Sequence, residues 1–139
     1  MKTTVDQFCI NVTDLERSVH FYETVLGLKA THRIETPDFR EVVLSGETGG
    51  RIQLAYQRNQ KGPIEHGNAL WKLYLQCDDC KLLYDRAMAA GAESVTPPTR
   101  LEHWPVTAAF FKDPDGYLVE ILETHGESPA VSGPGSEKW

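Results

Sequence analysis

The stretch DPDGYLVEILE, residues 113–123, decides the fold and poses the chemical question of this chain. Its first four residues contain Asp-Pro and Asp-Gly, two turn dipeptides, so a tight turn is expected there. An apolar strand follows, and Glu120 stands in the middle of it. A carboxylate inside an apolar strand costs free energy unless a partner satisfies it. The partner of Glu120 is therefore the first thing to identify.

The first half of the chain predicts a strand, a helix and three further strands. Residues 4–12 alternate, with Phe8, Ile10 and Val12 on one face, which is typical of a strand with one core face. Thr13 or Asp14 then caps a helix whose apolar stripe is Leu15, Val19, Tyr22 and Leu26, and Gly27 ends it. The three further strands are expected at residues 28–34, 39–44 and 51–56.

The second half predicts the same succession. Residues 71–77 alternate, Asp78 or Asp79 caps a second helix, and Gly91 ends it. A short strand is expected at 93–95, followed by a loop that holds Pro97 and Pro98. The last two strands are expected at residues 106–112 and 117–123, joined by the turn at residues 113–116.

These two halves form an internal repeat. Asp14 and Asp79 are 65 residues apart, and Gly27 and Gly91 are 64 apart. A fixed spacing of this kind indicates duplicated modules. The predicted fold is an α+β protein of two βαβββ modules. Because each helix covers only one face of its sheet, the two open faces are expected to form a cupped mixed sheet with an internal cleft.

The module boundaries follow from composition. We expect the first module at residues 1–60, a polar linker at 61–69 and the second module at 70–124, which together make one functional domain. Residues 125–139 predict a mobile tail, in which Trp139 has no assigned contact.

Bulk composition excludes several classes of partner. The formal net charge is −6, with 14 Lys and Arg against 20 Asp and Glu, so the chain lacks the basic surface that nucleic acids require. No apolar run approaches a membrane span and the N-terminus has no signal-peptide core, so a cytoplasmic protein without a membrane partner is expected. Cys77 and Cys80 form a lone CxxC; we expect one buried and one helix-start cysteine rather than a zinc or redox site.

The repeat supplies partners for Glu120. Gln7 and Lys72 are 65 residues apart on the first strand of each module, and Gln53 and Glu120 are 67 apart on the last. All four have the parity of the face away from the helix. Equivalent positions of two modules are expected to converge near a pseudo-twofold axis, which would bring Lys72, Gln7 and Gln53 to Glu120.

Two motifs and the repeat also resemble a known superfamily. The segment VTDLERSVHFY at 12–22 and the DPDGYLVEILE ending look like the vicinal oxygen chelate superfamily over residues 4–124. Its members include glyoxalase I, methylmalonyl-CoA epimerase, extradiol dioxygenases and bleomycin-resistance binding proteins. The resemblance implies this fold, a small-molecule ligand and a homodimer.

In glyoxalase-like members the four positions equivalent to Gln7, Gln53, Lys72 and Glu120 carry metal ligands, typically His or Gln, Glu, His and Glu. Lys72 departs from that pattern, because an ammonium group repels a divalent cation and has no lone pair to offer. We therefore expect no metal and no other cofactor. Lys72 would instead supply the cation that pairs with Glu120, while Gln7 and Gln53 satisfy further hydrogen bonds.

Three functions remain open. The first is a glyoxalase-I-like lyase or isomerase acting on a small oxygenated molecule, with Glu120 and Lys72 as catalytic pair. The second is a non-catalytic protein that sequesters a drug or natural product, as bleomycin-resistance proteins do. The third is a divalent-metal enzyme in which His66 or His103 joins Glu120. The pair could also serve only to satisfy the fold. Oxygen activation is not favoured, since it needs a redox metal on two histidines and a carboxylate.

Further ligand-binding residues are expected beside this pair. Tyr74 shares the parity of Lys72, so it is the best candidate for stacking on a ligand. Trp104 and His103 are also expected to bind the ligand, since His103 flanks the cleft strands just before Trp104 and Pro105. The other aromatic residues of this set are expected to lie mostly in the core; they are Tyr56, Trp71, Phe110 and Phe111.

Overall fold

The computed structural model describes residues 1–126 and divides the chain into two compact units. The N-terminal unit is Met1–His66 and the C-terminal unit begins at Gly67, so the division falls inside the predicted linker. The predicted mobile tail, including Trp139, lies outside the described residues except for its first two positions.

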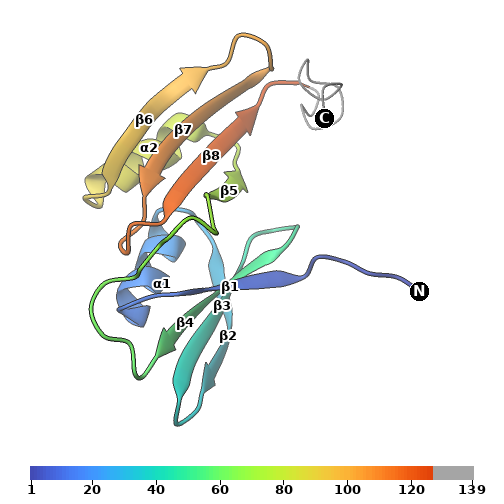
Figure 1. Cartoon of the computed structure of the whole chain (residues 1–139). Coiled ribbons are helices and arrows are strands. Elements are labelled where there is room, and N and C mark those ends of the chain that lie inside the picture. Colours follow the sequence, from blue (N-terminus) through green and yellow to red (C-terminus); the bar gives the residue numbers. More distant parts are fainter. Residues whose placement is uncertain (127–139) are drawn as a thin grey trace. The chain divides into compact units, whose positions relative to one another are not determined.

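The N-terminal unit is a βαβββ module with a mixed sheet (Figure 1). The sheet order is β1-β4-β3-β2, in which β1 runs parallel to β4 and the other neighbours are antiparallel. The parallel pair places the first and last strands of the unit side by side. Its elements are β1 (Gln7–Asn11), α1 (Leu15–Thr24), β2 (Lys29–Glu35), β3 (Phe39–Ser45) and β4 (Arg51–Gln57).

The C-terminal unit repeats this arrangement. Its sheet order is β5-β8-β7-β6, again with one parallel pair, β5 and β8. The predicted α+β fold of two βαβββ modules is thus confirmed. The elements are β5 (Leu73–Gln76), α2 (Cys80–Ala89), β6 (Glu93–Arg100), β7 (Val106–Lys112) and β8 (Leu118–Thr124).

Both helices begin at the predicted aspartates. The Asp14 carboxylate accepts a hydrogen bond from the Arg17 backbone N–H at 3.1 Å, and Asp79 accepts one from Leu82 N–H at 3.0 Å. Each bond satisfies a donor that the first helical turn would otherwise leave open. Gly27 follows α1 with a φ of 70° and Gly91 follows α2 with a φ of 86°, a conformation that favours glycine.

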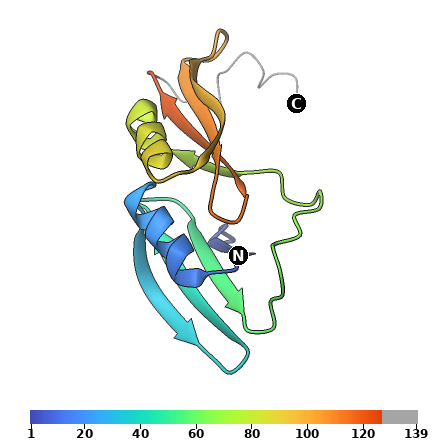
Figure 2. The ribbon, with the colours of Figure 1, turned by 90° about the vertical axis from the view of Figure 1, so that its left-hand side faces the viewer.

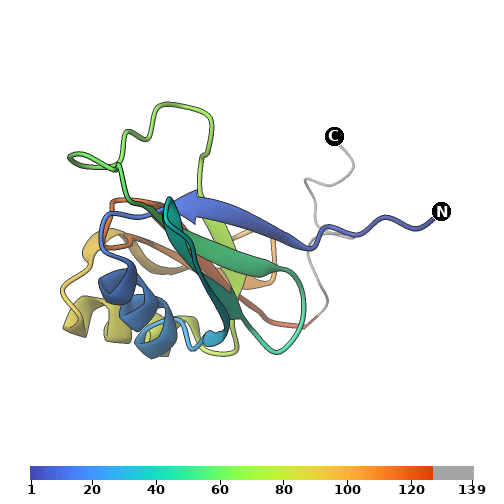
Figure 3. The same ribbon diagram turned by 90° about the horizontal axis from the view of Figure 1, so that it is seen from below.

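Each helix covers one face of its own sheet (Figure 2). Helix α1 packs against β2, β3 and β4, and α2 packs against β6, β7 and β8. Phe8, on the edge strand β1, stays 46% exposed, although Ile10 and Val12 are buried as predicted. Residues 1–6 continue outward from β1 without regular structure (Figure 3).

The predicted loop at Pro97 and Pro98 is wrong, because β6 runs through both prolines to Arg100. Proline cannot donate to a sheet ladder, so it is tolerated at a sheet edge or an irregularity. β6 is an edge strand, and its pairing with β7 shifts register between Thr96 and Thr99, around the two prolines.

The turn at residues 113–116 is tied together by the buried side chain of Asp113. Its Oδ1 accepts from the backbone N–H groups of Asp115 and Tyr117, each at 2.9 Å. Gly116 has a φ of 88° and its N–H donates to the Asp113 carbonyl at 3.0 Å. This turn fixes the start of β8 and therefore the register of Glu120.

No helix among residues 1–126 is both long enough and apolar enough to cross a membrane.

Candidate functional site

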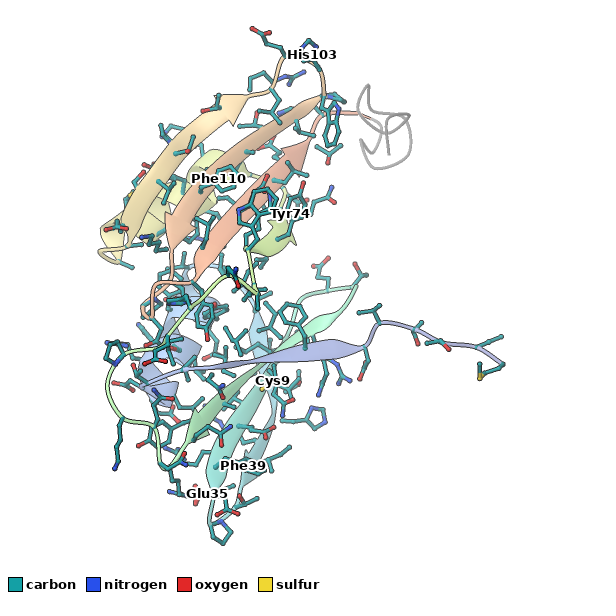
Figure 4. All side chains as sticks on the ribbon, in the orientation of Figure 1. Cys9, Glu35, Phe39, Tyr74, His103 and Phe110 are labelled. Carbon is teal, nitrogen blue, oxygen red and sulfur yellow. The ribbon has the colours of Figure 1, made fainter. Side chains whose placement is uncertain are left out.

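Three neighbouring strands bring Glu120 together with two aromatic residues. In the C-terminal unit, Tyr74 of β5 pairs with Glu120 of β8, and Glu120 pairs with Phe110 of β7. Val119 and Ile121 are fully buried on the face that α2 covers, so Glu120 lies on the opposite, open face. Lys72, two residues before Tyr74, has the same parity. Figure 4 labels Tyr74 and Phe110 on this sheet.

Lys72 is the partner of Glu120. Its Nζ donates a hydrogen bond to Glu120 Oε1, and the two side chains form an ion pair. The Lys72 side chain is 19% exposed and that of Glu120 only 7%, so the carboxylate has lost most of its water. A buried carboxylate is tolerated when a cation and hydrogen bonds replace that water. The predicted Lys72–Glu120 pair is therefore present in the structure.

Three aromatic rings complete the surroundings of the ammonium group. The Lys72 Nζ lies 4.1 Å from the ring centroid of Trp71, 5.2 Å from Tyr74 and 5.4 Å from Phe110. These distances are within the range of a cation–π interaction. Burial, and then the negative charge of Glu120, raise the pKa of the Tyr74 hydroxyl. The ring of Tyr74 thus lies beside the ion pair, close enough for the charge of Glu120 to affect the pKa of its hydroxyl group.

The N-terminal unit has a neutral version of the same arrangement. Gln7 Nε2 donates to Gln53 Oε1 at 3.1 Å, and Cys9 pairs with Gln53 in the strand register as Tyr74 pairs with Glu120. Two amides bonded to each other, one on the exposed Gln7 and one on the half-buried Gln53, carry no net charge. The predicted contact of Gln7 and Gln53 with Glu120 concerns two separate units and stays a prediction.

In each unit, a second side-chain hydrogen bond joins the first and last strands next to this first pair. Gln57 Nε2 donates to Asn11 Oδ1 at 3.2 Å, and Gln76 Nε2 donates to Thr124 Oγ1 at 2.8 Å. The members of these bridges keep the same 65- and 67-residue offsets as the first pair. The repeat therefore extends to side-chain contacts between the first and last strands, which the sequence pattern could have revealed.

The other predicted ligand-binding residues lie further along the C-terminal unit. His103 is exposed in the connection between β6 and β7, apart from Tyr74 and Phe110 (Figure 4). Trp104 is half-buried and packs against Val106, Ala108 and Leu122. A role of His103 or Trp104 in ligand binding stays a prediction.

Sequence reasoning missed the part played by Trp71 and Phe110, which were expected mainly in the core. Trp71 is 75% exposed and Phe110 is half-buried, and both rings face the Lys72 ammonium group. A signal was available for Phe110, because it pairs directly with Glu120 once the 113–116 turn sets the register. The sequence predicted a strand from residue 71, but β5 begins only at Leu73, so strand alternation does not describe the direction of the Trp71 side chain.

Burial raises the pKa values of both thiols of the CxxC segment. Cys80 is both fully buried and the first residue of α2, and its N–H donates to Glu123 Oε1 at 2.9 Å. Burial is the main reason that the pKa of the Cys77 thiol rises to about 11 and that of Cys80 to about 12. Thiols with raised pKa values hold their protons at neutral pH, when only the thiolate would bind zinc or attack a disulfide.

The donor set at the family position does not fit a divalent ion. Lys72 has no lone pair in its ammonium form, and its charge already engages the Glu120 carboxylate. Gln7 and Gln53 offer only neutral amide groups, which bond to each other. Within residues 1–126, no group of three or more His, Cys, Asp or Glu side chains could hold a metal ion, and recruitment of His66 or His103 stays a prediction.

The fold defines the class of this protein: it has two βαβββ units, each with a four-stranded sheet, and polar side chains pair where the first and last strands of each unit meet. The chain belongs to the Glyoxalase/Bleomycin resistance protein/Dioxygenase superfamily, whose model matches residues 4–121. A sequence relative is the lactoylglutathione lyase of Haemophilus influenzae, which is 29% identical over 82% of this chain and 87% of its own length.

Solved structures confirm the fold. Glyoxalase I from Zea mays superposes with a TM-score of 0.77 at 22% identity over 88% of this chain, which spans only 45% of the maize protein. An antibiotic-binding protein from Streptomyces sp. CB03234 superposes with a TM-score of 0.70 at 20% identity, over 89% of this chain and 98% of its own. At these identities the likeness concerns the fold alone.

Proposed function

We propose that the protein is a glyoxalase-I-like lyase or isomerase that acts on a small oxygenated molecule at the Lys72–Glu120 pair. The observation that carries this proposal is a buried acid–base pair on the open face of a sheet, next to an exposed tryptophan. The sequence relatedness to lactoylglutathione lyases supports the same class of chemistry.

The proposed reaction moves one proton and needs no metal. The Lys72 ammonium would hydrogen-bond to a substrate carbonyl oxygen, and Glu120 would remove a proton from the adjacent carbon. The electron pair of that C–H bond would pass to the oxygen as an enolate, which Lys72 stabilises. Return of a proton to the opposite face of that same carbon completes an epimerisation, which is one kind of isomerisation. Expulsion of a leaving group with its electron pair from the next carbon instead completes an elimination and leaves the proton on Glu120.

Deuterium exchange tests the first half of this reaction directly. Lactoylglutathione, the compound after which the related lyases are named, would be incubated with the protein in D2O, and loss of the proton next to its carbonyl would be followed by NMR. We expect exchange with the wild-type protein and a loss of about 100-fold or more in Glu120→Gln. Glu93→Gln, which changes an exposed carboxylate of the same unit, is the control. Exchange that survives Glu120→Gln contradicts the proposal.

The second candidate is a protein that sequesters a planar drug or natural product without chemistry. The exposure of Trp71, 75%, and of Tyr74, 52%, favours it, because exposed aromatic side chains beside a charged pair can stack on a ligand. A panel of planar antibiotics titrated against tryptophan fluorescence tests this idea. Binding that is lost in Trp71→Ala but kept in Glu120→Gln supports sequestration, and the reverse supports the enzyme.

The homodimer implied by the family is part of the proposal. Light scattering after gel filtration should give twice the mass of the chain; a monomer at micromolar concentration would contradict it.

A further inference from the structure

We infer that Trp71, Tyr74, Phe110 and Glu120 form an organic-ammonium site that the chain fills with its own Lys72. This inference rests on the geometry of the C-terminal unit and does not require turnover. It assigns a chemical class to the site: a primary alkylammonium group on a flexible hydrocarbon stem, and not a divalent metal ion.

The composition of the site is what an ammonium group requires. A carboxylate accepts one N–H donor of Lys72, and three ring faces lie 4.1 to 5.4 Å from its nitrogen. Ring faces attract a cation through their quadrupole, and this attraction grows as water is removed. The Lys72 side chain, 19% exposed, is largely removed from water.

The same composition excludes a metal ion. Divalent ions need several oxygen, nitrogen or thiolate donors at short distance, and they surrender their water only to such donors. Besides Glu120, the Lys72 ammonium group lies against the ring faces of Trp71, Tyr74 and Phe110, and a ring face offers no lone pair to a metal ion. Removal of Lys72 should therefore leave a cavity selective for organic ammonium ions and not for the metals of the family.

The backbone explains why Lys72 belongs to this site. Tyr74 and Glu120 are register partners, and so are Glu120 and Phe110. Trp71 and Lys72 lie just before β5, so the chain delivers the cation and its closest ring from adjacent positions. The equivalent of Lys72 in the N-terminal unit is Gln7, which is bonded to an amide and needs no cation. The ammonium site is thus a property of the C-terminal unit alone.

Chemical rescue of Lys72→Ala tests the inference. This substitution removes three methylenes and the ammonium group, which n-propylammonium restores. We expect Lys72→Ala to lower Tm, n-propylammonium to restore most of the loss in a saturable manner, and neutral n-propanol to restore none. The double variant Lys72→Ala/Glu120→Gln should lose the rescue. Lys81→Ala, which removes an exposed lysine of α2, should show no response to the amine.

The outcomes are decisive. Rescue of folded Lys72→Ala by Ni²⁺ or Zn²⁺ in place of the amine overturns the inference, and so does equal rescue by propanol or no rescue at all.

Because the variant could fail to fold, a second measurement uses the wild-type protein. Acylation of lysines with an N-hydroxysuccinimide ester, followed by peptide mass spectrometry, should modify Lys72 about tenfold more slowly than Lys81, whose side chain is 77% exposed. Equal rates overturn the inference. Neither measurement depends on lyase activity, so the proposed function can fail while this inference holds.

Discussion

At the same place in their sheets, the N-terminal unit holds the neutral pair Gln7–Gln53 and the C-terminal unit holds the ion pair Lys72–Glu120. Both pairs join the segment at the start of the first strand to the last strand of the unit, which run parallel. Gln7 is exposed and Gln53 half-buried, whereas the Lys72 side chain is 19% and the Glu120 side chain 7% exposed. One repeat has therefore produced two sites with the same backbone and different electrostatics.

The difference between the two pairs shows which interactions each site needs to remain stable. An exposed amide pair loses little if it breaks, because water replaces each partner. A buried carboxylate has no such replacement, so the C-terminal unit must supply a cation and keep it in place. Three aromatic rings around Lys72 help to hold this cation in place, and one of them, Trp71, stays 75% exposed. Specialisation of the site thus follows from burial.

The largest expected effect is at Lys72. Lys72→Ala leaves the Glu120 carboxylate buried without its cation, so the free energy of unfolding should fall by about 3 kcal/mol. The matched change in the N-terminal unit, Gln7→Ala, should cost about 0.5 kcal/mol or less because its bond is exposed. Urea unfolding followed by circular dichroism measures both. Equal costs would show that the ion pair contributes no more than the amide pair.

The next largest effect is expected at the turn before β8. Asp113→Ala removes the acceptor of two backbone N–H groups, so we expect a loss of about 2 kcal/mol. The corresponding turn of the N-terminal unit, between β3 and β4, carries the exposed Glu47, and Glu47→Ala should change stability by about 0.5 kcal/mol or less. A loss at Asp113 no greater than that at Glu47 would mean that Gly116 and Asp-Pro suffice to form the turn.

Much of the fold could be read from the sequence, because its signals are local. The caps Asp14 and Asp79 and the stop glycines Gly27 and Gly91 act within one helical turn. The 65-residue offset then identified the two modules. The course of β6 could not be read in this way, since Pro97 and Pro98 argue locally against a strand and only the position at the sheet edge permits one.

The site was predictable to the extent that strand parity determines it. Parity and the repeat placed Lys72 beside Glu120, and both were then found as a pair. Tyr74 was expected beside the pair by its parity, but Trp71 and Phe110 were not. The predicted strand began at Trp71 whereas β5 begins only at Leu73, and Phe110 was assigned to the core by its hydrophobicity. Outside a strand, side-chain direction depends on loop conformation, which a single sequence does not specify.

The cysteines extend the comparison to alkaline pH. Cys77 and Cys80 have pKa values of about 11 and about 12 in the folded C-terminal unit, against an ordinary value of 9.0. Between pH 9 and about 12, the two thiols lose their protons in the unfolded chain and keep them in the folded chain. The free energy of unfolding should therefore be unaffected below pH 9 and fall as pH rises toward 12. A Cys77→Ser/Cys80→Ala variant should show a shallower fall in urea titrations; an unchanged slope would contradict the raised pKa values.

The exposed Cys9 of the N-terminal unit is the matched probe. Its thiol should react with a maleimide at pH 8 before that of Cys80, which should react only when the unit unfolds. Simultaneous labelling, read by peptide mass spectrometry, would mean that Cys80 is accessible in the folded protein.

The smallest effect is expected where the helices carry different charges at equivalent positions. Glu16 of α1 pairs with Arg33 of β2 at 3.0 Å and with Arg40 of β3 at 3.3 Å, whereas Lys81 of α2 pairs only within its helix, with Asp85, among the ion pairs of residues 1–126. Because the Glu16 side chain is 57% exposed, Glu16→Gln should cost about 0.5 kcal/mol at low salt. That cost should vanish in 1 M NaCl, where screening removes exposed ion pairs. A loss of stability that persists at high salt would mean that Glu16 connects α1 to its sheet through hydrogen bonds that do not depend on its charge. The Lys81–Asp85 pair lies within α2 and makes no such connection to the sheet.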